Sequence, residues 1–317
     1  MSEPAIAQPE VSVVVPLFNE VESLVELERG IRESLTTLGL SYEIIFVDDG
    51  SVDGSFDAVA KLHSERPGIR AIRFRRNYGK AAALAFGFEA ARGNFIVTMD
   101  GDLQDDPGEI GKLLARMDEG YDLVSGWKRQ RQDPWTKRWP SRCFNWVTSR
   151  VSGIRIHDFN CGLKAYRKAV TREIAVYGEL HRYLPVLAHW RGFRVAEVEV
   201  RHRERKYGRT KYGLQRFIRG FLDLLTVVMI TRYTRSPLHL FGTTGIVLNL
   251  VGIIINSYLL ILKFQHGDIQ GRTPLLMLGV LLMMVGVQFV SIGLLGEMIA
   301  RIQQSDERDY SVLETLD

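Results

Sequence analysis

The chain has 317 residues, which is enough for one or two domains with a large core. Its net charge of +4 is small and indicates no partner until the positions of the charges are known. The two cysteines, Cys143 and Cys161, exclude a disulfide scaffold and favour a reducing cytosolic location, although a single bridge is compatible with this count. Residues 1–10 are polar, so we expect no cleavable signal peptide.

The first two thirds of the chain alternate between strand-like and helix-like segments. The strand-like segments are short and apolar, and apolar residues three or four apart mark the helices between them. We expect Asn19 to cap the first helix, with Glu22 closing a capping box. Asp106 is expected to cap a later helix, with Pro107 at its first position. The expected strands are residues 11–15, 42–47, 69–74, 95–98, 121–125 and 195–200.

Strands that alternate with helices at this spacing predict an α/β fold with a doubly wound, mostly parallel sheet. Acidic residues directly follow three of the expected strands. They are Glu20, Asp48 with Asp49, and Asp100 with Asp102. Because open α/β sheets bind ligands at the carboxyl ends of their strands, we expect these side chains to form one site.

The acidic turn at residues 99–107 is the clearest candidate site. Asp100 and Asp102 leave a buried strand together, and carboxylate and amide oxygens suit Mg²⁺ or Mn²⁺. An Asp-x-Asp pair alone is more often a solvated turn. However, no G-x-G-x-x-G follows the first strand and no P-loop occurs, since residues 77–80 resemble one only superficially. The sequence therefore disfavours dehydrogenases and P-loop ATPases and favours a metal that holds a phosphate.

Two basic segments follow the acidic turn. In residues 127–150, cations alternate with tryptophans, which fits either a solvated helix with core aromatics or a segment at a membrane interface. Nucleic acid is the weakest partner for this segment because membrane spans lie downstream. Residues 201–211 combine cations with a glycine, which predicts a positive flank of a membrane anchor and a place to hold a phosphate at the bilayer surface.

Residues 157–167 precede an expected short helix. In this segment, His157 and Asp158 are either acid/base groups or, as is more common, turn formers. His157, Cys161 and His181 lack the spacing of zinc ligands, so we exclude a zinc site.

The composition changes near Ser236 from that of a soluble α/β protein to that of a membrane protein. Residues 213–231 predict an amphipathic interfacial helix, and residues 238–262 and 275–300 exceed the roughly 20 apolar residues that a span needs. Arginines before the first span, with Arg301 after the second, predict that both termini and the catalytic domain lie in the cytosol.

Four polar residues lie in or beside the two spans, and we expect them to mark helix or subunit contacts rather than a substrate path: Asn249, Asn256, Gln288 and Glu297. They would permit a homo-oligomer. The predicted domains are a catalytic domain with an interfacial segment at 127–152, a juxtamembrane helix, a two-helix membrane domain and a cytosolic tail. Their bounds are 1–212, 213–235, 236–303 and 304–317.

Several motifs resemble those of glycosyltransferase family 2, which has the GT-A fold. The Asp-Leu-Gln of the acidic turn and residues 207–212 resemble the polyprenyl-phosphate glycosyltransferases of that family, and the resemblance extends through the two spans. It implies a GT-A-type mostly parallel sheet with flanking helices, followed by interfacial amphipathic helices and two transmembrane helices. The other motifs are residues 13–20, 47–51, 77–80 and 100–107.

The resemblance also implies roles for individual residues on the donor side. It places a bound Mg²⁺ or Mn²⁺ at Asp100, Asp102 and Gln104. The nucleotide sugar, which is UDP- or GDP-linked, would be bound by Pro16, Phe18, Glu20, Asp48, Asp49, Lys80, Asp100, Gly101 and Asp102.

On the acceptor side, the resemblance implies that cations hold the phosphate of a polyprenyl phosphate. Some relatives have an acidic residue where this chain has Gly162, and Asp158 is the nearest carboxylate that could replace it as a base. The implied acceptor-phosphate residues are Ser141, Arg142, Arg205 and Lys211, of which the last two would also act in catalysis.

The expected function is the inverting transfer of one sugar from a nucleotide sugar, of the UDP-glucose or GDP-mannose type, to polyprenyl phosphate at the cytosolic membrane face. A phosphate acceptor is already largely anionic at neutral pH, so it needs orientation by cations more than a base. Two alternatives remain open. One is a polysaccharide synthase of the same fold, and the other is a catalytically silent membrane scaffold.

Overall fold

The computed structural model describes residues 8–129, 145, 148–150, 152–174, 176, 178, 180–203, 236–269 and 271–304. The chain divides into two compact units, Met1–Leu224 and Leu225–Asp317, and each is considered by itself. The predicted amphipathic helix at 213–231 and most of the predicted interfacial segment lie outside the described residues.

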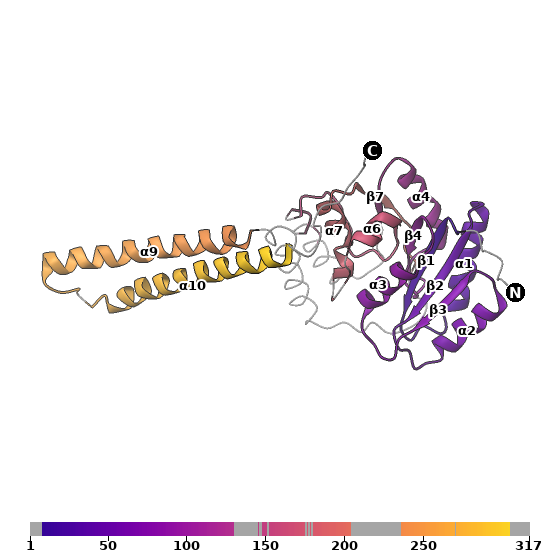
Figure 1. Ribbon diagram of the computed structural model, residues 1–317, viewed down its shortest axis with the longest axis horizontal. Helices are drawn as coiled ribbons and strands as arrows, with labels where there is room; N and C mark the ends of the chain where they lie inside the picture. The colour runs from indigo at the N-terminus through magenta and orange to yellow at the C-terminus, as the bar shows by residue number, and fades with distance from the viewer. Residues whose placement is uncertain are drawn as a thin grey trace. The chain divides into compact units, whose positions relative to one another are not determined.

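The first unit is built on a mixed, mostly parallel sheet with the strand order β3-β2-β1-β4-β6-β5-β7 (Figure 1). β1 pairs in parallel with β2 on one side and with β4 on the other. β6 is antiparallel to both of its neighbours, β4 and β5. The strands are β1 (Val11–Leu17), β2 (Tyr42–Asp48), β3 (Ile69–Arg73), β4 (Phe95–Thr98), β5 (Leu123–Trp127), β6 (Lys164–Arg167) and β7 (Val195–Glu199).

The six expected strands are all present, and β6 is the addition. The pattern of residues 164–167 does not predict a strand, because β6 is only four residues long and begins and ends with a cation. Its partners on both sides and the burial of Lys164 and Tyr166 show that it is a central strand. The sheet therefore departs from a fully parallel arrangement at this position.

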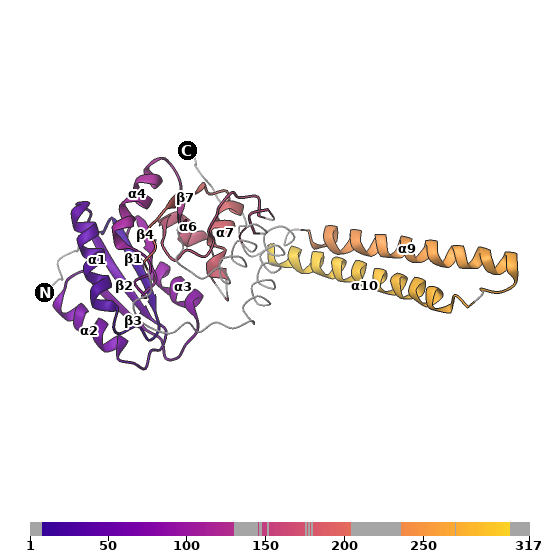
Figure 2. The ribbon, with the colours of Figure 1, turned by 180° about the vertical axis from the view of Figure 1, so that it is seen from behind.

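Helices cover both faces of the sheet (Figures 1 and 2). Successive residues of β1 point to opposite faces, so Val13 packs against one helix layer and Val14 against the other. The first layer contains α1 (Leu24–Thr37), α2 (Ser55–Glu65) and α4 (Ile110–Asp118). The second contains α3 (Lys80–Ala90), α6 (Lys168–Glu173) and α7 (Leu184–Trp190).

The predicted capping box at the start of α1 is wrong. Asn19 has a left-handed φ of 57°, and its side-chain oxygen accepts a hydrogen bond of 3.0 Å from the amide of Val52. Asn19 thus joins the loops after β1 and β2, while α1 begins later, after Ser23. The second predicted cap is confirmed, since Asp106 accepts from the amide of Gly108 at the start of the short helix η1 (Pro107–Glu109).

The second unit is a pair of packed helices, α9 (Pro237–His266) and α10 (Thr273–Gln304) (Figure 1). Both are long and apolar enough to cross a membrane. Glycines line their contact. A β-carbon at Gly245 would lie 2.5 Å from the carbonyl oxygen of Gly286, and one at Gly252 would lie 2.6 Å from that of Gly279. The helix backbones therefore approach closely, as small residues allow in membranes.

The polar residues of α9 and α10 do not share one environment. Asn249 lies against Gly286 and Asn256 against Gly279, so both belong to the contact between α9 and α10. This matches the expectation of a helix contact. Gln288 is exposed on this helix pair and is not explained by that contact.

Candidate active site

The carboxyl ends of β2, β1 and β4 lie side by side because these strands are neighbours in the sheet. The loops that leave them are joined by hydrogen bonds. The hydroxyl of Ser23 donates to the carbonyl oxygens of Glu20 and Gly101, at 2.8 and 2.5 Å. The predicted residues after the first and fourth strands therefore do meet at one edge of the sheet, where α/β proteins bind ligands.

Lys80 and Asp100 form an ion pair at this edge. Lys80 is the first residue of α3, and Asp100 follows β4. Burial opposes ionisation of Asp100, but the charge and hydrogen bond of Lys80 outweigh it and lower the pKa of the carboxyl to about 2. Both side chains keep about a third of their surface exposed, 34% and 31%, so the pair is accessible to a ligand.

Asp49 fixes the start of α3. Its two carboxylate oxygens accept hydrogen bonds from the amides of Tyr78 and Gly79, at 2.6 and 2.8 Å. The next residue is Lys80, so Asp49 positions the cation that pairs with Asp100. Asp48 is buried, and its carboxylate accepts a hydrogen bond from the amide of Ser51 in the turn that follows β2.

The acidic turn has an unusual backbone. Leu103 is buried and adopts a left-handed φ of 61°, a conformation that is uncommon outside glycine. Beside it, Asp102 is largely buried and accepts a hydrogen bond of 3.1 Å from the amide of Gln104. The turn therefore brings Asp102 and Gln104 close together, two residues beyond Asp100.

The donor atoms suit a hard divalent cation. Among the described residues, no three His, Cys, Asp or Glu side chains are grouped closely enough to hold a metal without other ligands. Mg²⁺ and related ions usually take one or two carboxylates and complete their shell with water and substrate phosphates. The carboxylates of Asp100 and Asp102, with the side-chain amide oxygen of Gln104, are ligands of the kind that this pattern requires.

Lys164 and His181 interact electrostatically with Lys80 and Asp100, and neither is among the predicted site residues. Burial lowers the pKa of Lys164, whose ammonium donates to the carbonyl of Cys161. His181 lies in the short helix η2 (Leu180–Arg182), which contacts α3. Burial, followed by the positive charges of Lys80 and Arg182, lowers the pKa of its imidazole to about 2.

The other predicted residues have different surroundings. Asp158 is buried and accepts from the amide of Asn160, as expected of a turn former. His157 pairs with Glu197 and stacks on Trp127 at a ring separation of 4.3 Å. The predicted acceptor residues lie outside the described residues: Ser141, Arg142, Arg205 and Lys211.

The mostly parallel sheet with helices on both faces, together with similar solved structures, identifies a GT-A-type glycosyltransferase fold. Residues 12–175 match glycosyl transferase family 2, and the chain belongs to this family. A solved structure of similar fold is glucosyl-3-phosphoglycerate synthase of Mycobacterium tuberculosis, in complex with Mn²⁺, UDP and phosphoglyceric acid. Its TM-score is 0.54 and its identity 18%, with 70% of this chain and 78% of that one covered.

Two curated relatives align over most of their length. The dodecaprenyl-phosphate galacturonate synthase of Rhizobium johnstonii is 37% identical over 315 residues, which are 97% of this chain and 93% of that protein. The undecaprenyl-phosphate 4-deoxy-4-formamido-L-arabinose transferase of Pseudomonas aeruginosa is 38% identical over 295 residues, or 92% and 85% of the two chains. Both alignments are too long to be confined to the family 2 domain, so they include the region of α9 and α10.

Proposed function

We propose that the protein transfers one sugar from a nucleotide sugar to a polyprenyl phosphate at the cytosolic face of a membrane. The observation that carries this proposal is the combination, in one chain, of the Lys80–Asp100 site with two helices apolar enough to span a membrane. The relatives named as polyprenyl-phosphate sugar transferases align with nearly the whole chain, which supports the same acceptor class. Both termini would lie in the cytosol.

The residues of the edge have distinct tasks in this reaction. Asp100, Asp102 and Gln104 would bind Mg²⁺ or Mn²⁺, which when present neutralises the diphosphate of the donor. Lys80, held by Asp49, adds a positive charge next to the same group. The bond between the anomeric carbon and the diphosphate oxygen breaks while an oxygen of the lipid phosphate bonds to that carbon from the opposite face. The configuration therefore inverts.

A general base is not needed for this attack. A phosphate monoester has a second pKa near 6 and is largely a dianion at neutral pH, so its oxygen is already a nucleophile. The surroundings of Asp158 agree with this, because its carboxylate accepts a hydrogen bond from a backbone amide of its own turn. Orientation of the phosphate would instead come from Arg205 and Lys211, with Ser141 and Arg142 as further candidates.

The two alternative functions make different demands on the sequence. A processive polysaccharide synthase would be expected to carry a Gln-x-x-Arg-Trp motif, which the residues around Gln215 do not supply. A silent scaffold would have no reason to keep Lys80 paired with Asp100 beside Asp102 and Gln104. Both features favour the single-sugar transferase.

The donor can be identified by testing membranes that contain the protein. They would be given undecaprenyl phosphate and a panel of labelled nucleotide sugars, including UDP-glucose, UDP-galacturonate and GDP-mannose, and the lipid product would be analysed by mass spectrometry. We expect one donor to give a product with a single sugar. A product with several sugars would indicate a polymerising synthase, and no lipid product with any donor would contradict the proposal.

The metal and acceptor roles can be separated with two variants. Asp102→Ala should lower transfer roughly 100-fold or more, because it removes a metal ligand. Asp118→Ala removes an exposed carboxylate on α4 and is the matched control. Arg205→Ala should weaken use of the lipid phosphate and leave nucleotide affinity unchanged. If Arg205→Ala changes only nucleotide affinity, its assignment to the acceptor is wrong.

A further inference from the structure

The acidic run Asp100–Glu109 has a second half that binds cations of the protein itself. Asp105 pairs with Lys128 at 2.7 Å, and Asp106 pairs with Arg203 at 2.9 Å. Glu109 lies 3.7 Å from Arg201. The carboxylates proposed to bind the metal are thus followed directly by carboxylates that join two distant parts of the chain.

These ion pairs form two junctions, one between the acidic turn and Lys128 and the other between the acidic turn and residues 201–203. Backbone contacts strengthen the second junction. Asp105 and His202 form an isolated antiparallel bridge, and the amide of Arg203 donates to the carbonyl of Gln104 at 3.0 Å. Residues 201–203 therefore run beside residues 104–106 after the chain leaves β7. The ion pair of Arg203 with Asp106 adds a side-chain contact to the same junction.

The other junction is buried. The side chains of Lys128 and Asp105 expose only 10% and 1% of their surface. Burial alone would favour a neutral lysine, but the charge of Asp105 raises the pKa of Lys128 above its usual value. A buried pair of this kind is costly to break on one side, because the remaining charge has no partner. The end of β5 is therefore held firmly to the acidic turn.

Each junction immediately precedes, along the chain, a segment that we propose to bind the acceptor. Lys128 precedes the segment that contains Ser141 and Arg142, and Arg203 is two residues before Arg205. Two residues extend the chain by at most about 7 Å. The junction at Arg203 therefore limits the distance of Arg205 from the acidic turn, while the Lys128 junction fixes only the start of the segment that leads to Ser141.

We propose that Asp105 and Asp106 are positioning residues that align the acceptor-binding segments with the metal-binding half of the same turn. This inference depends on the proposed function. Asp100 and Asp102 act on the donor, while Asp105 and Asp106 hold the start of the segments that present the lipid phosphate. Because all four belong to one short turn, the two substrates are placed relative to each other by a single rigid element.

The Asp106–Arg203 pair allows a sharp test. Asp106→Asn keeps an oxygen that can accept from Gly108 at the start of η1, and it removes only the charge. Arg203→Gln removes the other charge. The matched control is Arg116→Gln, which removes an arginine from an ion pair with Glu119 on α4. Kinetics would be measured in detergent with undecaprenyl phosphate and the nucleotide sugar that the wild type uses, and binding of UDP or GDP by calorimetry.

We expect each single variant to raise the KM for undecaprenyl phosphate about twofold to fivefold, as for a partly exposed ion pair. The affinity for the nucleotide should stay within about twofold of the wild type. The double variant should be no worse than the poorer single variant, because both remove the same interaction. A purely structural role would instead change nucleotide affinity and the KM for the acceptor together.

Three results would overturn the inference. They are an unchanged KM for the acceptor in both variants, an equal loss of nucleotide affinity, and effects in the double variant that simply add. If the wild type itself transfers no sugar to undecaprenyl phosphate, the proposed function fails and the inference fails with it. A wild type that transfers sugar beside variants with an unchanged acceptor KM contradicts the inference alone.

Discussion

The α-carbon of Gly162 lies directly against the carboxylate of Asp100. A β-carbon at Gly162 would be 2.6 Å from Cγ of Asp100 and 2.8 Å from Oδ1, the oxygen that pairs with Lys80. The hydroxyl of Thr98 holds Gly162 in place by donating to its carbonyl oxygen at 2.9 Å. Only a residue without a side chain leaves room for the Lys80–Asp100 pair in this geometry.

Gly162→Ala should therefore damage the proposed donor site without unfolding the protein. The backbone at this position is not left-handed, so alanine is compatible with it and the effect is steric. Crowding of this kind costs about 1–3 kcal/mol, so we expect binding of UDP or GDP with Mn²⁺ to weaken roughly tenfold. Calorimetric titration would measure this affinity.

A matched control for Gly162→Ala is Gly111→Ala on α4. There a β-carbon would meet only the flexible end of Leu38, at 3.2 Å. We expect its nucleotide affinity to equal that of the wild type. Equal affinities in the two variants would mean that Asp100 does not need the space beside Gly162.

The pKa of His181 makes a prediction about pH. Burial and the nearby cations lower this pKa to about 2, so the imidazole should gain no proton between pH 8 and pH 5.5. A histidine with its usual pKa of about 6.5 would become positive in this range and strengthen the binding of a diphosphate. His181→Gln should therefore leave the pH dependence of UDP or GDP affinity unchanged.

Comparing the wild type with His181→Gln isolates the effect of His181 protonation, because protonation of the nucleotide itself affects both proteins equally. Affinities would be measured at half-unit steps of pH without metal. A rise in affinity below pH 7 that occurs in the wild type and disappears in His181→Gln would show that His181 does titrate in this range.

Much of the fold, and the position of the acidic residues at the edge of the sheet, follow from local sequence patterns. Asp100 and Asp102 come directly after an apolar strand, so their place at the sheet edge could be predicted from the strand alone. β6 could not, since a strand that begins with Lys164 becomes recognisable only when that lysine is seen to be buried. The pairing of Asp105 with Lys128 was equally hidden, because nothing in either segment indicates its distant partner.

Asn19 illustrates a different limit. Its position before an apolar helix and three residues before Glu22 satisfies the pattern of a capping box. The competing hydrogen bond with the loop after β2 is long-range and is made at a left-handed φ, and neither can be read from the neighbouring residues. The local pattern was therefore outweighed by a tertiary contact.

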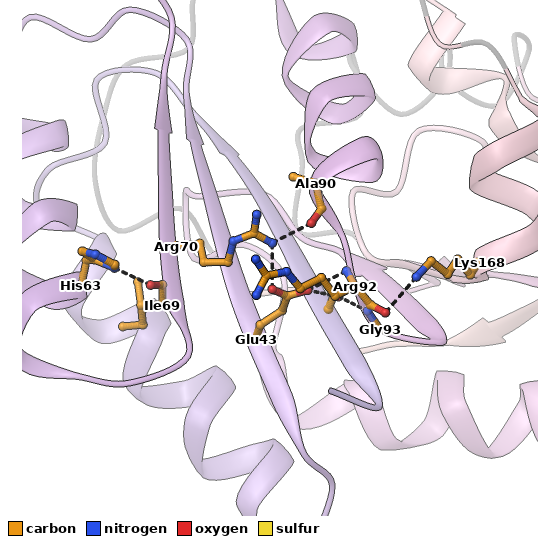
Figure 3. A network of polar contacts seen from close by, with 9 residues as sticks. Glu43, His63, Ile69, Arg70, Ala90, Arg92, Gly93 and Lys168 are labelled. Atoms are coloured by element: carbon orange, nitrogen blue, oxygen red, sulfur yellow. Dashed lines mark hydrogen bonds and ion pairs between the residues drawn. The ribbon is translucent and has the colours of Figure 1, made fainter. Parts of the chain in front are cut away.

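Glu43 is the centre of a polar network at the amino ends of the strands, away from the site (Figure 3). Its Oε1 accepts from the hydroxyl of Ser12 and the amide of Arg92, at 2.6 and 2.7 Å. Its Oε2 accepts from Arg70 at 2.9 Å, and Arg70 also donates to the carbonyl of Ala90. The network ties β1, β2 and β3 to the end of α3.

Glu43→Gln should lower stability and leave catalysis intact. The substitution removes the charge that holds Arg70, and a buried bond to a charged group contributes about 1.5–3 kcal/mol. We expect the melting temperature of the purified protein in detergent to fall by about 4–10 °C. The exposed Glu33→Gln on α1 serves as the control. A loss of turnover per folded molecule would show that the network also acts on the site.

The last prediction concerns the glycines between α9 and α10. A β-carbon at Gly286 would lie 2.7 Å from the backbone oxygen of Gly245, which cannot move without shifting the whole helix. Gly286→Leu should therefore force the helices apart at a cost of about 1–3 kcal/mol or more. Val287→Leu, at a neighbouring position that is 58% exposed, should cost nothing comparable.

Thermal stability in detergent distinguishes these two variants. It is measured as the fraction of protein that remains monodisperse after heating. We expect Gly286→Leu to lose its monodisperse peak at a lower temperature than Val287→Leu, because only the first change lies at the helix contact. Identical melting of the two variants would mean that α9 and α10 do not depend on a close backbone approach at Gly286. In that case Asn249, which lies against Gly286, would need another explanation for its place in the apolar helix α9.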